Sequence, residues 1–293
     1  MKIIVQNYTD KLTTEPMYLT QALQAAGIDT YLWNTQQVSV YDLFDSVQPT
    51  HLVCHWRYIS NDLVDYLNQP NCKIKVAINV TGATEAQMKS IGEVFSKVKC
   101  FHFTNSVKAH GGAKTLWPAH DIFNVKKVMG VPNISFGVCA ETFSEKVSEF
   151  VGNKDVYHLL YIGANQEKEP EFDLTINATN IAQLFPIYKQ FHIHGNLDLC
   201  ASQVFFDAIM ACPLSVDCED KEGWDNFLNT CMKTPKGYSE SDHIVESLRK
   251  TIRQNHTPFH RAARLMKIIG ENEAMQKVEV IKSRVSQQLE QTA

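Results

Sequence analysis

Residues 191–220 have the residue types and the spacing of a site that binds an anion. A short apolar strand is predicted over 191–194, a polar loop with Gly195 follows, and Ser202 favours the N-cap position of the next helix. A helix N-terminus presents backbone N–H groups and the positive end of the helix dipole, which suit a phosphate. Asp207, further along that helix, could accept hydrogen bonds from ribose hydroxyls. An ordinary strand–helix–strand unit with a polar loop has the same pattern, and this interpretation stays open.

Two histidines on the same strand could approach that anion. His192 and His194 alternate along the strand, so their side chains face the same side. His194 directly precedes Gly195 at the strand end and is the better ligand candidate, whereas His192 has the position of a core histidine.

The stretch resembles the donor-binding segment of GT-B glycosyltransferases, especially the CgeB-like and related viral (phage) enzymes. That family tends to carry Arg-x-Phe-Glu-x-x-Ala-Cys-Gly, and the matching run here is SQVFFDAIMACP over 202–213. Gln203 or Val204 stands where Arg is usual, and Asp207 stands where Glu is usual. One extra residue separates the acid from the Ala-Cys pair, and Pro213 replaces the Gly.

Other segments resemble the same family. His256, Thr257 and Arg261 match the spacing of its late His-Thr-x-x-x-Arg element, for which the resemblance implies a helix cap and bonds to nearby carbonyls. The run Tyr-Ile-Gly ending at Gly163 resembles the first donor-domain strand, and residues 41–55 resemble part of the acceptor domain more weakly.

The resemblance implies an enzyme that moves a sugar from a nucleotide-sugar donor, such as a UDP-sugar, to an acceptor hydroxyl. No cofactor is expected. No metal is expected either, because GT-B enzymes stabilise the leaving diphosphate with helix dipoles and basic side chains, and the chain has no DxD motif between apolar strands. The donor-binding residues expected are Gly163, His194, Gly195, Ser202, Gln203 and Asp207.

An inverting transfer also requires a base that deprotonates the acceptor hydroxyl. Carboxylates and a histidine in the loops of the first half are the candidates for this role. They are Asp10, Glu15, His55 and Glu85. For Glu85 the alternative is a plain helix start, with Thr84 as the N-cap and Glu85 in the first turn.

Residues 97–127 are rich in lysine, with histidines and Trp117 interleaved, and could follow a polyanion through charge and stacking. The acceptor-binding candidates are Lys108, Lys114, Trp117 and Lys126. They would suit a modified base in phage DNA as the acceptor. A solvated strand edge and loop has the same composition, and the net charge of −4 favours a protein or a glycan as the acceptor instead.

A second class of function stays open. The chain could bind a nucleotide sugar without catalysis, as a partner or scaffold subunit, which the missing Arg and a short second domain favour. Binding without turnover would identify this class, because an enzyme must do both.

The first half of the chain predicts the elements that position these residues. Strands and helices alternate, which predicts a parallel sheet with helices on both faces. The strands are predicted over 2–6, 30–33, 51–55, 74–80 and 100–104, and the helices over 14–26, 40–47, 60–68 and 85–97. Ligands of such sheets bind at the carboxyl ends of the strands, so the loops 7–15, 55–58, 80–85 and 104–112 are expected to be functional.

The predicted fold class is α/β, with two Rossmann-like domains that face a cleft and a second domain that is trimmed. The acceptor-side domain is predicted over 1–135 and the nucleotide-sugar domain over 136–270. Residues 131–141 are interpreted as the crossover between them. A charged amphipathic helix is predicted over 271–290, either packed back on the first domain or exposed.

Composition restricts the class of protein further. The chain has 293 residues, 44% of them hydrophobic, and its apolar runs are too short to cross a bilayer. The eight cysteines are scattered singly, without CxxC or zinc-site spacing, which predicts free thiols in a cytoplasmic protein. The first residues are interpreted as a strand rather than a signal peptide.

Overall fold

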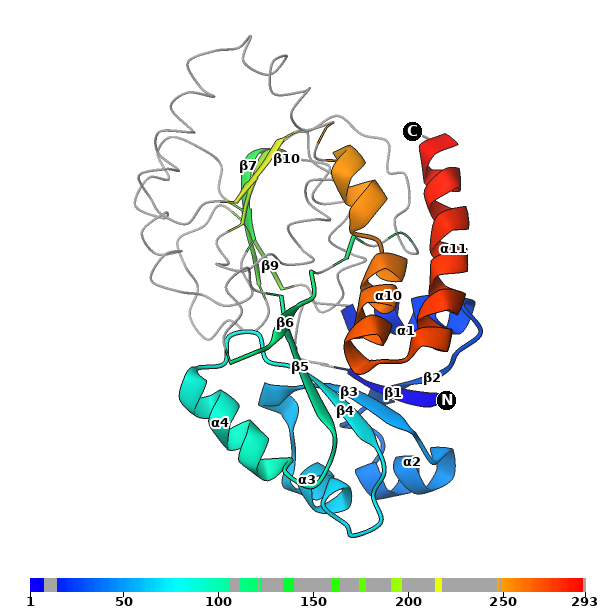
Figure 1. Ribbon diagram of the computed structural model, residues 1–293. Coiled ribbons are helices and arrows are strands. Elements are labelled where there is room, and N and C mark those ends of the chain that lie inside the picture. Colours follow the sequence, from blue (N-terminus) through cyan, green and yellow to red (C-terminus); the bar gives the residue numbers. More distant parts are fainter. Residues whose placement is uncertain are drawn as a thin grey trace. The chain divides into compact units, whose positions relative to one another are not determined.

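A computed structural model describes the chain over residues 1–7, 15–105, 111–117, 119–120, 122, 247 and 249–291, together with the backbone of the strands between 134 and 217 (Figure 1). The chain divides into two compact units. The first unit contains residues 1–9, 15–119 and 256–293, and the second contains 10–14 and 120–255. The sequence prediction placed the corresponding limits at 135 and 270.

Within the described residues, the first unit contains a parallel sheet of six strands in the order β2-β1-β3-β4-β5-β6. Its strands are β1 (Lys2–Asn7), β2 (Asp29–Asn34), β3 (His51–His55), β4 (Lys75–Asn79), β5 (Cys100–Thr104) and β6 (Lys114–Thr115). The central strands read as nearly continuous apolar runs because helices bury both of their faces. This confirms the parallel α/β sheet that the alternation predicted, with the short edge strand β6 added.

Helices cover both faces of this sheet (Figure 1). On one face lie α2 (Val40–Val47), α3 (Asn61–Leu67) and α4 (Glu85–Val94), and their apolar side chains form a core with β1, β3 and β4 around Phe44 and Leu63. On the other face lie α1 (Glu15–Ala25), α10 (Pro258–Ile269) and α11 (Asn272–Gln291). Both C-terminal helices contact α1, so the two ends of the chain belong to one unit.

The helix boundaries follow local chemistry. Ser39, Ser60 and Thr84 each accept a hydrogen bond from the backbone N–H three residues on, which satisfies a donor that the first helical turn leaves unpaired. The last of these confirms the cap expected at Thr84. Helix α10 begins with Pro258 and ends at Gly270, whose φ of 79° is readily adopted only by glycine.

The second unit has a parallel sheet of its own, in the order β11-β10-β7-β8-β9 among its described strands. The strands are β7 (Ile134–Cys139), β8 (Leu160–Gly163), β9 (Leu174–Asn177), β10 (Phe191–Asn196) and β11 (Leu214–Asp217). The prediction of a crossover over 131–141 is wrong, because its central residues form β7 in the middle of this sheet. The alternation of Ile134, Phe136 and Val138 is the pattern of a strand, and it outweighs the flanking proline.

Candidate functional site

The carboxyl ends of the strands in the first unit are polar, whereas the strand interiors are mainly apolar. Strands β1, β3, β4 and β5 end in Asn7, His55, Asn79 and Thr104. All four strands are parallel, so these residues lie along the same edge of the sheet. This is the edge at which parallel α/β sheets bind ligands.

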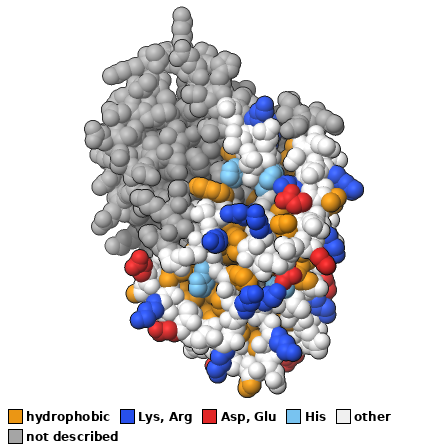
Figure 2. Space-filling view, viewed as in Figure 1, with side chains coloured by type: hydrophobic (Ala, Val, Ile, Leu, Met, Phe, Trp, Pro, Cys, Tyr) orange, Lys and Arg blue, Asp and Glu red, His pale blue; other side chains and the backbone are white. Residues whose placement is uncertain are grey.

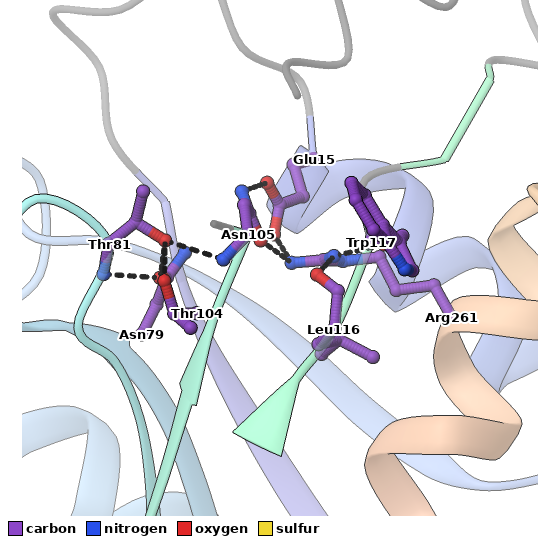
Figure 3. Close-up of polar contacts among 8 residues, drawn as sticks. All are labelled: Glu15, Asn79, Thr81, Thr104, Asn105, Leu116, Trp117 and Arg261. Carbon is purple, nitrogen blue, oxygen red and sulfur yellow. Dashed lines mark hydrogen bonds and ion pairs between the residues drawn. The ribbon is translucent and has the colours of Figure 1, made fainter. Parts of the chain in front are cut away.

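The loops after β4 and β5 are joined by a network of hydrogen bonds (Figure 3). The Oδ1 atom of Asn79 accepts from the backbone N–H of Thr81 at 3.1 Å and from its hydroxyl at 2.6 Å. The Oγ1 atom of Thr81 also accepts from the backbone N–H of Asn105 at 2.8 Å and lies 3.4 Å from the hydroxyl of Thr104. Asn79 and Thr104 are buried, so the sheet itself holds these two loops at a constant separation.

A buried arginine joins the same edge to the C-terminal helices (Figure 3). Arg261 of α10 donates from Nη1 to the carbonyls of Leu116 and Trp117, at 2.7 and 2.5 Å, and from Nη2 to Asn105 Oδ1 at 3.2 Å. Its guanidinium also forms an ion pair with Glu15, at the start of α1. A buried charge is tolerated only when it is paired and hydrogen-bonded, and here both conditions are met. The expected bonding of Arg261 to nearby carbonyls is therefore confirmed.

The residues His256 and Thr257, which precede Arg261 in the His-Thr-x-x-x-Arg element, have different roles. Thr257 stands at the N-cap of α10, but its hydroxyl lies 2.8 Å from Nδ1 of His260 and makes no side-chain bond to the helix backbone. Burial, with the nearby Lys282 ammonium, lowers the pKa of His260 to about 4, so this ring is neutral at pH 7. Burial also lowers the pKa of His256, whose ring meets that of Trp117 edge to face at 6.3 Å.

The turn after β3 is held by Gln6, a buried polar residue in the apolar strand β1. Its Oε1 atom accepts from the backbone N–H of His55 at 3.2 Å, and its Nε2 atom donates to the carbonyl of Tyr58 at 2.8 Å. One side chain therefore ties both ends of the turn to the sheet.

The candidate base His55 has a defined ring orientation. Its Nδ1 atom accepts a hydrogen bond from the backbone N–H of Arg57 at 3.2 Å. That bond favours the neutral tautomer with the proton on Nε2, in which the ring donates a hydrogen bond at Nε2. His55 can take up a proton at Nδ1 only when the bond to Arg57 opens.

The other candidate bases are placed as follows. The carboxylate of Glu15 accepts from the Asn105 amide at 3.3 Å in addition to its ion pair with Arg261. Glu85 is exposed in the first turn of α4, next to the reciprocal cap between Thr84 and Gln87. Asp10 lies outside the described residues.

Two of the expected donor residues lie at the same edge of the second sheet. Gly163 ends β8, and Gly195, which follows His194, lies near the end of β10. Both strands pair with β7, one on each side, so the two glycines are separated by a single strand. Strand spacing places them about 10 Å apart across the sheet. Ser202, Gln203 and Asp207 lie outside the described residues.

The acceptor candidates are only partly described. Lys114 is exposed at the start of β6, and Trp117 is 38% exposed. The sequence stretch around them does not stay at one edge of the sheet, because Lys97 and Lys99 precede β5 at its amino end. Lys108 and Lys126 lie outside the described residues.

Sequence reasoning missed several residues of this edge. It singled out the loops 55–58 and 80–85 but named neither Trp56 nor Arg57, and it did not weigh Gln6. A polar residue within the strand, directly after the apolar run Ile3–Val5, was the available signal for Gln6.

Among the described residues, no group of three or more His, Cys, Asp or Glu side chains could hold a metal ion. No helix of the described part of the chain is long and apolar enough to span a membrane.

The chain was compared with known protein families, curated proteins and solved structures. No protein-family model matches the chain, and no curated protein matches it in sequence. Among solved structures, it is similar to the UDP-GlcNAc 2-epimerase of Methanocaldococcus jannaschii in complex with UDP-GlcNAc and UDP, with TM-score 0.46, 11% identity, and coverage of 75% of this chain and 84% of that one.

Two further structures align over nearly the whole chain. One is a protein named as a UDP-N-acetylglucosamine 2-epimerase of Listeria monocytogenes, with TM-score 0.44, 9% identity, and coverage of 95% of this chain and 90% of that one. The other is the spinosyn forosaminyltransferase SpnP, with TM-score 0.41, 8% identity, and coverage of 98% of this chain and 95% of that one. At this level of similarity neither an activity nor a ligand transfers to this chain.

Proposed function

We propose that the protein is a glycosyltransferase that moves a sugar from a nucleotide-sugar donor, such as a UDP-sugar, to an acceptor hydroxyl. The observation that carries the proposal is the polar carboxyl edge of the first sheet, built from Asn79, Thr81, Asn105 and His55. The resemblance of residues 191–220 to the donor-binding segment of GT-B glycosyltransferases supports it. The edge offers the fixed hydrogen-bonding groups that orient a hydroxylated acceptor.

The donor would be bound by the second unit. Gly163 and Gly195 leave space for close approach at the ends of β8 and β10, and the helix predicted from Ser202 would direct its N-terminus toward the diphosphate. Asp207 would hold the ribose, and His194 would approach the phosphates. In this arrangement backbone dipoles stabilise the leaving diphosphate, so turnover should survive removal of divalent metal by a chelator.

The test is a calorimetric titration of the full-length chain with a panel of nucleotide sugars, paired with an assay for sugar release or transfer. A donor at about 100 times its dissociation constant should also raise the free energy of unfolding by about 2.7 kcal/mol, which a thermal-shift panel detects first. A panel in which no nucleotide sugar binds would refute the proposal.

The competing function is binding of a nucleotide sugar without catalysis. The absence of the usual Arg at Gln203 or Val204 favours it. The same titration separates the two functions, because tight donor binding without hydrolysis or transfer to any acceptor identifies a binding or scaffold protein.

DNA with a modified base is the polyanionic acceptor that Lys114 and Trp117 would suit. A duplex should then bind with an affinity that falls steeply between low and moderate salt, because each phosphate contact releases counterions. Reversing the charges of Lys108, Lys114 and Lys126 together should abolish that binding and leave donor binding intact. A wild-type protein that does not bind duplex DNA at low salt would leave a protein or a glycan as the acceptor.

A further inference from the structure

The turn after β3 carries a cation at the carboxyl edge of the first sheet, and none of the carboxylates in the described part of the chain pairs with it. Arg57 lies in the short 3₁₀ helix Trp56–Tyr58 and is exposed. Its guanidinium carbon lies 5.3 Å from the centre of the Trp56 ring, and none of the acidic side chains in the described part of the chain pairs with it. Among the described residues, its exposed guanidinium therefore keeps its positive charge without an acidic partner.

The position of this cation is set from the buried sheet outward. The indole N–H of Trp56 donates to the carbonyl of Thr81 at 2.9 Å, and Thr81 is bonded in turn to the buried Asn79. The ring on which the guanidinium rests is thus tied to the end of β4. A long arginine side chain loses rotamer entropy when a ligand immobilises it, and stacking on the Trp56 ring removes part of that cost beforehand.

Gly82 lies against the same guanidinium. A Cβ atom built on Gly82 would lie 3.2 Å from Nη2 of Arg57, and the φ of Gly82 is +74°, a conformation that other residues rarely adopt. Glycine at this position therefore does two things: it permits the turn after β4, and it leaves the space that the guanidinium occupies.

The groups around Arg57 are suited to an oxyanion. The neighbouring His55 ring, in the tautomer that its Nδ1 bond favours, carries a proton on Nε2. A guanidinium binds carboxylate or phosphate through two parallel N–H bonds, which are stronger than bonds between neutral groups.

We infer that Arg57, stacked on Trp56 and next to Gly82, binds a phosphate or carboxylate group of the acceptor, so that the acceptor is a small anionic sugar rather than a neutral one. That the bound anion is the acceptor rests on the proposed function. The oxyanion site itself does not depend on that function.

The test compares ligands that differ only in the oxyanion. The full-length protein is titrated with glucose, glucose 6-phosphate and glucuronate, with tryptophan fluorescence as the readout. The wild type should bind one of the two anions at least about tenfold more tightly than glucose, and Arg57→Gln should lose that preference. The stronger anion identifies phosphate or carboxylate as the group recognised. Arg264→Gln, which removes an exposed arginine of α10, is the matched control and should keep it.

Two further variants address the surroundings. Gly82→Ala keeps the charge of Arg57 but adds a Cβ atom 3.2 Å from the position of its Nη2 atom. It should therefore weaken anion binding while leaving glucose binding unchanged. Arg57→Lys keeps the charge but not the planar fork and should bind the anions with intermediate affinity. Circular dichroism melting of each variant shows whether the fold is kept, and Arg57→Lys provides the test if Arg57→Gln does not fold.

Three results would overturn the inference. The wild type could show no preference for either anion over glucose, Arg57→Gln could bind them as Arg264→Gln does, or a duplex oligonucleotide could bind through Arg57 more tightly than either sugar. Titration of the same variants with nucleotide sugars distinguishes failure of the Arg57 inference from failure of the proposed glycosyltransferase function. Loss of anion binding with intact nucleotide-sugar binding supports Arg57, whereas a wild type that binds anions but no nucleotide sugar overturns only the glycosyltransferase.

Discussion

At the scale of single residues, the buried ion pair of Arg261 and Glu15 has the largest expected effect. The two side chains are 2% and 12% exposed. Removing one partner leaves an uncompensated buried charge, so Arg261→Gln should lower the free energy of unfolding by about 3–5 kcal/mol. Urea denaturation of the full-length chain measures this change.

The control for this prediction lies on the same helix. Arg264 is exposed, so Arg264→Gln should change the stability by less than about 0.5 kcal/mol. The double variant Glu15→Gln/Arg261→Gln should cost less than the sum of the two single changes, since it removes both charges. Additive costs would mean that the two side chains do not stabilise each other.

A second prediction for a single residue concerns Asp207 and its role in donor binding. Asp207→Ala should weaken nucleotide-sugar binding by about 1–3 kcal/mol if its carboxylate accepts hydrogen bonds from the ribose. Asp65→Ala, an exposed acid on α3, is the matched control and should bind the donor as the wild type does. Calorimetry on both variants decides the role, and equal affinities would exclude it.

At the scale of elements, the start of α11 is attached to the amino edge of the first sheet. Glu271 Oε1 pairs with the Lys75 ammonium and lies 3.1 Å from Nε2 of the buried His51. The Lys75 hydrogen bond lowers the pKa of Glu271. Burial lowers the pKa of His51 and outweighs the attraction of Glu271, while Lys75 and the chain's amino terminus act in the same direction as burial.

Both shifts make this attachment sensitive to acid. A lowered pKa in the folded state means that the unfolded chain binds more protons, so stability falls as the pH falls. The contribution of His51 should be complete above its ordinary pKa of 6.5 and decline below it, and that of Glu271 should decline below 4.5. The urea midpoint measured from neutral to acidic pH reports this loss.

Glu271→Gln should lower the stability at neutral pH by about 1 kcal/mol, because the pair is partly exposed. It should remove the loss of stability below pH 4.5 that Glu271 causes, and it should steepen the loss below pH 6.5, because the pKa of His51 falls further without the attraction of Glu271. Glu273→Gln, two residues on and exposed, should leave both unchanged. An acid profile that is the same in Glu271→Gln and in the wild type would show that other groups control it.

At the scale of the whole molecule, the first unit needs both ends of the chain. The buried faces of α10 and α11 include Phe259, Leu265, Met266 and Val278. A chain that ends at Asn255 would expose the sheet face that these helices cover, and its first unit should not fold. Figure 2 shows one face of the molecule with its described side chains coloured by type. Hydrogen exchange in β1 and β3 should rise to that of unfolded peptide.

A shorter truncation controls for the loss of chain length. Removal of residues 285–293 keeps Val278 and all of α10, so protection of β1 and β3 should remain. If the chain ending at Asn255 kept its protection, the C-terminal helices would be dispensable for the first unit.

The sequence by itself determined the local elements and the fold class. The alternation of apolar segments predicted 40–47 as a helix and 51–55 as a strand with the boundaries that the structure has, because the hydrophobic pattern is a property of neighbouring residues. The two-residue strand β6 is too short to have a period, and β7 was obscured by its flanking proline and internal glycine.

Only the tertiary structure decided which distant residues meet. Arg261 and Glu15 are separated by nearly the whole chain, and no local pattern indicates that they pair. Likewise, Arg57 and Gly82 follow different strands, and they meet because β3 and β4 are adjacent and parallel. Sequence patterns report what each segment does alone, whereas strand order brings the ends of separate segments to one edge, and the candidate site is formed there.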